Sequence, residues 1–321
     1  MADRLAPLLA RFHLSASVFH SGALCGYASY DESEGVGHLH LVERGTFFLA
    51  SRAGGELERQ PVPALVLFAK PTSHRLFVPE DDEATLLCAT VRFGGGGDPI
   101  SRSLPSPLVI DLLAAPALHG IARLLFEEAF STRCGRQQAL DRLAELLLIH
   151  VLRHVLSAGL VERGAFSGLG DPQLAKALVA VHAQPAEPWT LERLAQVAGM
   201  SRARFAAHFH EVVGQTPGHY VAGYRVALAE AALRRGRPVK HVAADVGYAS
   251  ASALARVVRK RLGVSPGALL RGDAGTEATG DDGLELDARP TGTRPAHDPT
   301  ADARKLRPQP VSGGRKVKGV A

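Results

Sequence analysis

The sequence predicts an α+β protein, in which a small antiparallel β-barrel and a pair of helices precede an all-α domain. Runs rich in β-branched and aromatic residues, separated by turn residues, occupy residues 18–93. From Pro116 onward, apolar residues instead recur at the helical spacing i, i+3, i+4 and i+7. Within the helical part, one helix-turn-helix pattern occurs twice. We therefore expect a barrel at 1–110, a helical pair at 111–167, a tandem helix-turn-helix domain at 168–271 and a tail at 272–321.

The barrel is expected from several short strands in succession. The clearest candidates are "LHLVERGTFFLAS" at 39–51, "ALVLFAK" at 64–70 and "ATLLCATVRF" at 84–93. Many short strands at this spacing are typical of a small barrel or a sandwich.

Two helices are expected to follow, at 116–131 and 135–159. The second has a broad apolar stripe, and Gly135 and Gly159 bracket it. Such a stripe suits packing on the barrel and also suits self-association. The sequence leaves both roles open.

Charge is unevenly distributed along the chain. Residues 168–271 contain 14 Lys and Arg against 6 Asp and Glu, a net charge of +8, whereas residues 1–167 contain 15 against 18. A basic module beside a mildly acidic one indicates a polyanionic partner for the basic part. A solvated arginine-rich surface is the alternative on charge alone.

Composition argues against membrane and secreted classes. No apolar run approaches the ~18 residues that span a bilayer, and the N-terminal segment lacks the cationic start and cleavage site of a signal peptide. Three widely spaced cysteines, Cys25, Cys88 and Cys134, fit neither a disulfide framework nor a zinc motif. We expect a cytoplasmic protein with no membrane partner. The last fifty residues, rich in Gly, Pro, Thr and Asp, are expected to be disordered.

The repeated unit has one plan in both copies. "WTLERLAQVAGMSRARFAAHFHEVVGQTP" spans 189–217 and "RPVKHVAADVGYASASALARVVRKRLGVSP" spans 237–266. In each, a short helix meets a glycine, Gly199 or Gly247, which can adopt φ > 0 and end the helix in a sharp turn. A serine, Ser201 or Ser250, is then placed to cap the next helix. The second helix of such a unit is shaped to enter a DNA major groove.

Helical geometry divides the two second helices into a core edge and an outward edge. The expected core residues are Phe205, Phe209 and Val212 in the first, and Leu254, Val258 and Leu262 in the second. Arginine can bond guanine bidentately, so we expect the second helix to make more of the base contacts, through Arg256. The candidate DNA-contacting residues are Ser201, Arg202, Ala203, Arg204, Ala206, Ala207, Ser250, Ser252, Arg256, Arg259 and Lys260.

A helix is expected between the two units. From Pro217 to Arg235 it would have a length of roughly 28 Å at 1.5 Å per residue. A rigid spacer of this size could hold two recognition helices about one DNA turn, ~34 Å, apart. One chain could then read two successive major grooves.

These motifs resemble the DNA-binding domain of the AraC/XylS family of bacterial transcription regulators. "LAQVAGMSRARFAAHF" and "VAADVGYASASALARVVRKRLGVSP" carry the resemblance, which covers about residues 170–271. One departure is that the family usually has Phe where this chain has Leu254, Val258 and Leu262. The resemblance implies a regulator that binds double-stranded DNA, forms a homodimer through the helical pair and, if it is an activator, contacts RNA polymerase.

The N-terminal part resembles the cupin-type sensor domain of one subgroup of that family. The segments that carry this resemblance are "SGALCG", "HLHLVERG", "ALVLFAKPTSHRL" and "CATVRFGGG". It implies an effector, and oxidant-responsive members of the subgroup suggest Cys25 and Cys88 as a redox switch. Two buried apolar cysteines are the alternative.

Metal-binding cupins use a His-x-His pair, a Glu and a later His, for which the candidates are His38, His40, Glu43 and His74. Only two residues separate His40 from Glu43, which departs from the cupin spacing. We therefore expect neither a metal cofactor nor enzymatic activity. A metal-dependent cupin enzyme with an appended DNA-binding domain, and a repressor whose barrel only dimerises, remain as alternatives.

Overall fold

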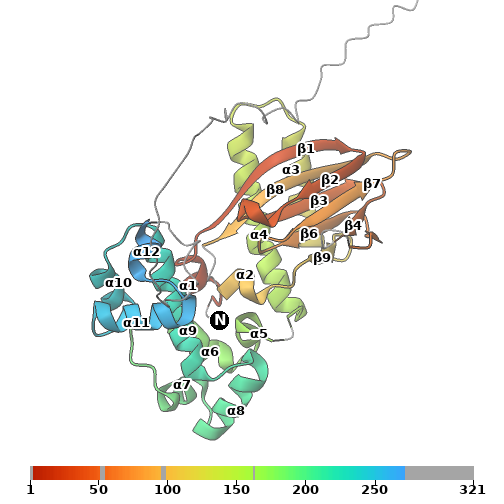
Figure 1. Ribbon diagram of the computed structural model, residues 1–321. Helices are drawn as coiled ribbons and strands as arrows, with labels where there is room; N and C mark the ends of the chain where they lie inside the picture. The colour runs from red at the N-terminus through yellow and green to blue at the C-terminus, as the bar shows by residue number, and fades with distance from the viewer. Residues whose placement is uncertain (1–2, 51–54, 95–98, 162, 272–321) are drawn as a thin grey trace, which may run out of the picture. The chain divides into compact units, whose positions relative to one another are not determined.

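The computed structural model describes residues 3–50, 55–94, 99–161 and 163–271. These residues belong to one compact unit (Figure 1). The expected tail at 272–321 lies outside the described residues. The predicted fold class is confirmed, with a β-rich N-terminal half and a helical C-terminal half.

The expected barrel takes the form of two antiparallel sheets. One sheet has the strand order β1-β8-β3-β6-β9 and the other the order β2-β7-β4-β5. The strands of the first sheet are β1 (Leu14–Leu24), β8 (Ala84–Phe93), β3 (Gly37–Arg44), β6 (Ala64–Phe68) and β9 (Leu108–Asp111). Those of the second are β2 (Gly26–Tyr30), β7 (His74–Val78), β4 (Phe48–Ala50) and β5 (Glu58–Arg59). A one-turn helix, η1 (Glu32–Glu34), connects β2 to β3.

Both faces of the five-stranded sheet are buried, which explains why its central strands are apolar almost without interruption. Successive side chains of a strand point to opposite faces. Val42, Val66 and Leu86 belong to the core between the two sheets. Leu41, Leu65 and Leu87 belong to the larger core on the other face, which the helices α3 (Pro116–Ala129) and α4 (Arg136–Ala158) cover.

The helical pair forms where the periodicity predicted it. Gly135 and Gly159 flank α4, and both adopt the left-handed conformation that glycine tolerates best. Leu140, Leu147 and Val151 of the predicted stripe are almost completely buried. Cys134 is exposed in the turn between α3 and α4.

The helical domain contains the two predicted helix-turn-helix units. Its helices are α5 (Ala165–Gly170), α6 (Leu174–Ala183), α7 (Leu191–Ala198), α8 (Arg202–Val213), α9 (Pro217–Arg234), α10 (Val239–Asp245), α11 (Ala251–Leu262) and α12 (Pro266–Arg271). Helix α9 is the predicted spacer, and α10, α11 and α12 pack against it. The boundary expected between residues 167 and 168 falls within helix α5, whose Ala165, Phe166 and Leu169 are buried.

Two arginine side chains of the N-terminal segment donate hydrogen bonds to backbone carbonyls of the helical domain. In the sequence, helix α1 (Ala6–Leu9) lies between Arg4 and Arg11. A second short helix, α2 (Pro99–Ser103), follows β8. Arg4 Nη1 donates to the carbonyl oxygens of Leu169 at 2.9 Å and Gly170 at 3.1 Å. Arg11 donates to those of His182 at 3.0 Å and Ala183 at 2.9 Å. Charged donors on carbonyl acceptors are among the stronger hydrogen bonds in proteins.

Candidate nucleic-acid interface and buried histidine cluster

The two helix-turn-helix units have the same turn and the same cap. Gly199 and Gly247 end α7 and α10 with φ of +69° and +80°. Ser201 Oγ accepts a hydrogen bond from the Arg204 amide at 3.4 Å. Ser250 Oγ accepts one from the Ala253 amide at 3.1 Å. These contacts confirm the local structure that the two motifs predicted.

The core edges of the recognition helices differ from the expectation at two positions, Val212 and Leu262. Phe205 and Phe209 of α8 are buried as expected, but the third buried residue is Val213 rather than Val212, which is half-buried. The 3.6-residue period, counted from Phe209, places residue 213 on the same edge. In α11, Leu254 and Val258 are fully buried and Leu262 is half-buried.

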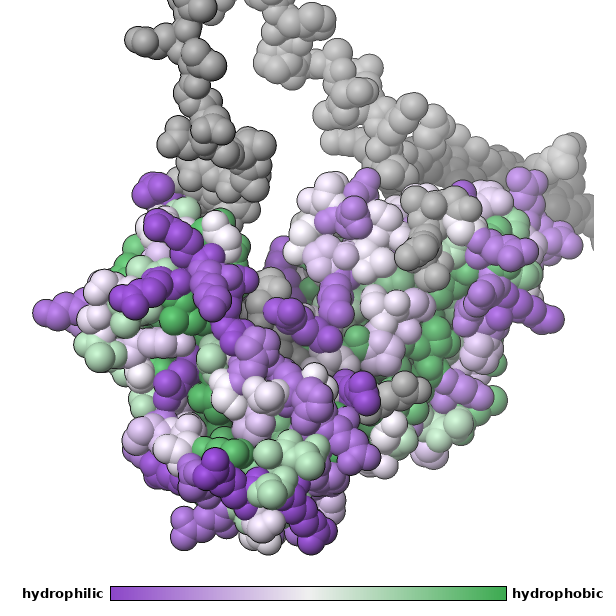
Figure 2. All heavy atoms as spheres, turned by 60° about the horizontal axis from the view of Figure 1, so that its bottom comes forward, coloured by the Kyte–Doolittle hydropathy of each residue, from purple (hydrophilic) through white to green (hydrophobic). Residues whose placement is uncertain are grey.

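The candidate DNA-contacting residues lie on the outward edges and at the capped ends of α8 and α11. All of them are exposed except Ala206, which is half-buried. Figure 2, which brings the end of the molecule with α7 and α8 forward, shows hydrophilic side chains over most of that face. The outward edges are thus polar or small in side chain, whereas the inward edges are apolar.

The basic candidate residues differ in whether they form an ion pair within the chain. Arg202 pairs with Glu192 of α7 at 2.9 Å, and both side chains are largely exposed. Arg204, Arg256, Arg259 and Lys260 have no ion pair with any described residue. The last turn of α11 therefore presents uncompensated positive charge to solvent.

Sequence reasoning missed the arginine that holds the two units together. Arg225 of α9 donates from Nε to the Pro185 carbonyl at 2.8 Å and from Nη2 to the Glu187 carbonyl at 2.7 Å. Its guanidinium also lies over the Tyr248 ring, 5.9 Å from the ring centroid. These contacts join the loop before α7 to the turn after α10. The only signal in the sequence is an arginine in the middle of a mainly apolar helix.

In the N-terminal domain, the structure brings together three of the four candidate metal ligands. His38, His40 and His74 are each about 99–100% buried between the two sheets. The His40 and His74 Nε2 atoms are 2.8 Å apart. Glu43 lies outside this cluster, because it falls at a shift in strand register between Val42 and Arg44.

The histidine nitrogens form a directed chain of hydrogen bonds. His74 Nδ1 donates a hydrogen bond to the Thr72 carbonyl at 2.7 Å, so Nε2 of the neutral ring accepts a hydrogen bond from His40 Nε2–H. His40 Nδ1 is then an acceptor, 3.1 Å from Cys88 Sγ. Burial, followed by the charges of its histidine neighbours, lowers the pKa of His40. Burial also lowers the pKa of His74 to about 4, so both rings are neutral at pH 7.

This chain does not fit a metal site. A metal ligand needs a ring nitrogen with a free lone pair, but the nitrogens of His40 and His74 are engaged with each other, with Cys88 and with Thr72. Among the described residues, no group of three or more His, Cys, Asp or Glu has a geometry that could hold a metal ion. The absence of a cofactor stays a prediction.

The structure does not bring the two cysteines of the expected redox switch together. Cys88 is fully buried on β8, whereas Cys25 is exposed just after β1. In the register of these strands, Cys88 pairs with His20 and Leu24 pairs with Ala84. Cys25 is five residues along the chain from His20, the partner of Cys88, so roughly 16 Å of strand separates the two positions, too far for a disulfide.

Cys88 is also chemically unlike a redox-sensitive thiol. Burial raises the pKa of its thiol to about 12, so the reactive thiolate is suppressed. Tyr30, which the sequence did not single out, has its hydroxyl 3.3 Å from Cys88 Sγ and its ring stacked on His74 at 4.7 Å. Tyr30, His74 and Cys88 come together through the pairing of strands that are far apart in the sequence. Sequence spacing therefore could not predict this cluster.

Comparisons with known proteins agree with the two halves of the fold. Residues 3–157 match the Cupin family, and residues 194–272 match the Helix-turn-helix domain family. A protein of Streptomyces lividans described as an AraC-like transcription regulator is 29% identical over 295 residues, which cover 83% of this chain and 96% of that protein. These matches agree with the resemblance to AraC-type transcription regulators.

Other relatives are matched over shorter parts of the chain. An uncharacterized HTH-type transcriptional regulator of Haemophilus influenzae is 33% identical over 52% of this chain, and the chain spans 56% of its length. The Escherichia coli protein RclR, named an RCS-specific HTH-type transcriptional activator, is 27% identical over 71% of this chain and 82% of its own length.

Among solved structures, the DNA-binding domain of AdpA in complex with a target DNA is 31% identical, with a TM-score of 0.30, over 32% of this chain and 92% of that domain. ToxT from Vibrio cholerae is 14% identical, with a TM-score of 0.36, over 83% of this chain and 100% of ToxT. None of the helices among the described residues is long and apolar enough to cross a membrane.

Proposed function

We propose that this chain regulates transcription by placing α8 and α11 in two successive major grooves of double-stranded DNA. The observation that carries the proposal is the matched pair of capped hairpins, α7–α8 and α10–α11, whose outward edges are exposed and basic. Helix α9, with 18 residues, spans roughly 27 Å, close to one turn of DNA. The AraC-type relatives support the same function.

The two recognition helices have different chemistry. On α8 the exposed Ala203 and Ala207 allow close approach and contact with thymine methyl groups. On α11 the unpaired Arg256 can donate two hydrogen bonds to guanine. Arg259 and Lys260, in the last turn, are placed for phosphates, which give affinity without base selectivity. Helix α11 therefore contributes more of the hydrogen-bonded readout.

Duplex binding by the full chain at increasing salt tests this function. The logarithm of the association constant should fall linearly with the logarithm of salt concentration, because each neutralised phosphate releases a counterion. Arg259→Ala combined with Lys260→Ala should weaken binding and flatten the slope by about one to two units. Arg133→Ala, on the exposed turn before α4, is the matched control. A slope that is unchanged in the double variant would reject these contacts.

For the N-terminal half we propose a sensor and a dimerisation role rather than catalysis. The alternative of a metal-dependent cupin enzyme lacks support, since the nitrogens of His40 and His74 are held in hydrogen bonds and the relatives matched over most of the chain are regulators. RclR is named a transcriptional activator, and activation through RNA polymerase is our proposal for this chain as well.

The proposed dimer forms through the helical pair. Leu124 of α3 and Leu146 of α4 expose 49% and 41% of their surface although both helices lie over the sheet. Exposed apolar residues on paired helices suit contact with a second copy. Light scattering of the Leu124→Glu and Leu146→Glu variants should show monomers. Tyr27→Ser, at an exposed aromatic residue on β2, should leave the parent's mass unchanged.

A further inference from the structure

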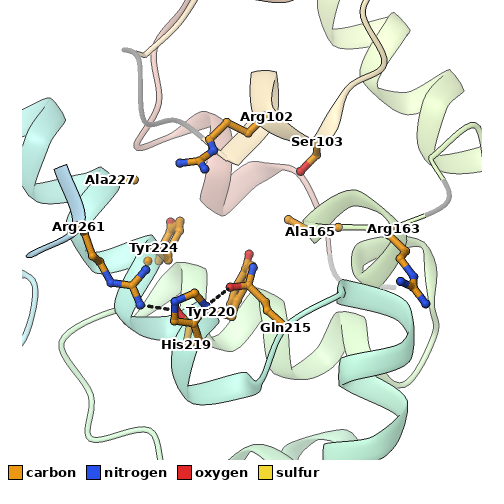
Figure 3. A pocket seen from close by; sticks show the side chains of 12 residues that line it. Arg102, Ser103, Arg163, Ala165, Gln215, His219, Tyr220, Tyr224, Ala227 and Arg261 are labelled. Carbon is orange, nitrogen blue, oxygen red and sulfur yellow. Dashed lines mark hydrogen bonds between the residues drawn. The ribbon is translucent and has the colours of Figure 1, made fainter. Parts of the chain in front are cut away.

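A cavity of about 280 Å³ lies where α2 of the N-terminal half meets α9 and α11 of the DNA-binding domain (Figure 3). The segment 163–165, just before and at the start of α5, closes another side. This volume lies near the lower end of the range for ligand pockets, so it suits a small molecule. The lining residues are Arg102, Ser103, Arg163, Gly164, Ala165, Gln215, His219, Tyr220, Gly223, Tyr224, Ala227 and Arg261.

The charged residues that line this cavity all carry positive charge. Three arginines, Arg102, Arg163 and Arg261, line it, and none of the lining residues is acidic. Arg102 and Arg163 have no ion pair with any residue in the described part of the chain. Guanidinium groups gathered without a counter-charge attract an anion, and their planar forks match carboxylate and phosphate oxygens.

The arginines differ in how they are held. Arg261 Nη2 donates to the His219 carbonyl at 3.2 Å, which anchors the guanidinium at the wall of the cavity. Figure 3 shows Arg261 and Arg102 on opposite sides of the cavity, Arg102 reaching from the N-terminal half. Arg163 lies at the far edge, next to Ala165, and is exposed. An anion between Arg102 and Arg261 would therefore contact both halves of the protein.

The floor of the cavity is aromatic rather than polar. Tyr220 and Tyr224 belong to the buried core of α9. Their hydroxyls are already engaged, Tyr220 with the His182 ring at 2.6 Å and Tyr224 with the His182 carbonyl at 3.4 Å. The tyrosines thus offer ring surface to a ligand, with Ala227 beside them.

At the rim, a hydrogen bond orients a neutral donor. His219 Nδ1 lies 2.9 Å from Gln215 Oε1 and donates to it. The amide NH₂ of Gln215 remains as a donor. The cavity therefore combines cationic donors, one amide donor and a short apolar floor, which matches an anionic group on a small carbon skeleton.

We propose that this cavity binds a small organic anion, a carboxylate or a phosphate, which bridges α2 of the sensor half and α11 of the DNA-binding half. Bound there, the anion ties the second recognition helix to the N-terminal half. The ligand site stands independently of DNA binding. Its consequence for the position of α11 on DNA rests on the function proposed above.

Calorimetric titration of the full chain at low ionic strength tests the site. The probes are malate for carboxylates and glycerol 3-phosphate for phosphates, with glycerol as the neutral control. We expect one saturable site per chain for at least one anion and none for glycerol. The stronger of the two anions identifies the class.

Variants decide whether the cavity is the site. Arg102→Gln and Arg261→Gln should each weaken binding about tenfold, as expected for loss of one charge-assisted contact. Arg102→Lys should recover part of the loss, and Arg133→Gln should match the parent. Circular dichroism identifies any variant that fails to fold.

Absence of anion binding to the parent, or equal affinity in the folded Arg102→Gln and Arg261→Gln variants, would overturn the proposal. Duplex affinity is measured on the same samples without anion. A chain that binds duplex but no anion refutes the ligand site alone, and a chain that binds anion but no duplex refutes the regulatory function alone.

Discussion

The Nε2 atom of His182 on α6 lies 2.6 Å from the hydroxyl oxygen of Tyr220 on α9. Burial raises the pKa of Tyr220, so the hydroxyl keeps its proton and donates a hydrogen bond to the ring nitrogen. Burial, and then the charge of Arg11, lower the pKa of His182 to about 3. The imidazole is therefore neutral in the folded protein, and this pair holds α6 against α9 beneath the proposed anion cavity.

This pairing predicts that acid destabilises the helical domain. The pKa of His182 is lower in the folded state than its value of about 6.5 in the unfolded chain, so below that pH the unfolded state binds more protons. The contribution of His182 to the free energy of unfolding is fully present above pH 6.5 and is lost as the pH falls toward 3. His182 alone should contribute a loss of about 2 kcal/mol between pH 7 and pH 5.

Urea unfolding of the parent and of His182→Gln at both pH values measures this contribution. The glutamine variant starts from a lower stability at pH 7, because it changes a buried contact. Its decrease from pH 7 to pH 5 should be smaller than the parent's by about 2 kcal/mol. Equal decreases in the two proteins would show that His182 does not titrate in this way.

The two turn glycines should respond differently to alanine. A Cβ at Gly247 would lie 2.6 Å from the Ala186 carbonyl oxygen, whereas a Cβ at Gly199 would meet nothing within 4 Å. Both have positive φ, which costs a non-glycine residue about 1–2 kcal/mol. Gly199→Ala should cost that amount, and Gly247→Ala should cost more because the turn must also move. Thermal unfolding compares them, and equal losses would mean that the contact with Ala186 relaxes freely.

The three cysteines should label at very different rates. Cys25 and Cys134 are exposed, whereas Cys88 is buried with a raised pKa. A maleimide should therefore modify Cys25 and Cys134 in the native chain, and Cys88 only in urea. After treatment with diamide, peptide mass spectrometry should find no Cys25–Cys88 disulfide within one folded chain. Detection of that linked peptide in the native monomer would contradict the strand register.

Elemental analysis should find the purified chain without a stoichiometric metal. The nitrogens of His40 and His74 are occupied by hydrogen bonds to each other, to Cys88 and to Thr72. Dialysis against EDTA should leave the melting temperature unchanged, since binding of a metal to the native state alone would raise it. One zinc or iron per chain, with a lower melting temperature after EDTA, would disprove this assignment.

Local signals predicted most of the fold and the turns and caps of both helix-turn-helix units. Gly199, Ser201, Gly247 and Ser250 could be located from sequence because helix caps and turns depend on residues within one turn of each other. The helical pair followed from its apolar period. Val213 was missed because the 3.6-residue helical period, counted from Phe209, falls between Val212 and Val213, and both positions fit it.

Contacts between distant segments could not be predicted in this way. Cys88 and His40 meet because β8 pairs with β3, and Cys25 is separated from Cys88 by the register of β1 on β8. The anion cavity joins Arg102 to Arg261, which are far apart in the sequence and carry no shared motif. Such groupings depend on tertiary packing, which sequence spacing does not report.

The central claim is that α8 and α11 of one chain occupy two successive major grooves. Dimethyl sulfate protection tests it most directly, because this reagent methylates guanine N7 in the major groove. A duplex selected from a random pool by the full chain should show two protected segments about 10 base pairs apart on one face of the helix for each bound chain. Arg256→Ala should lose protection in one segment and weaken binding by about 1–3 kcal/mol. A single protected segment per chain, or full protection of both segments by Arg256→Ala, would contradict the account.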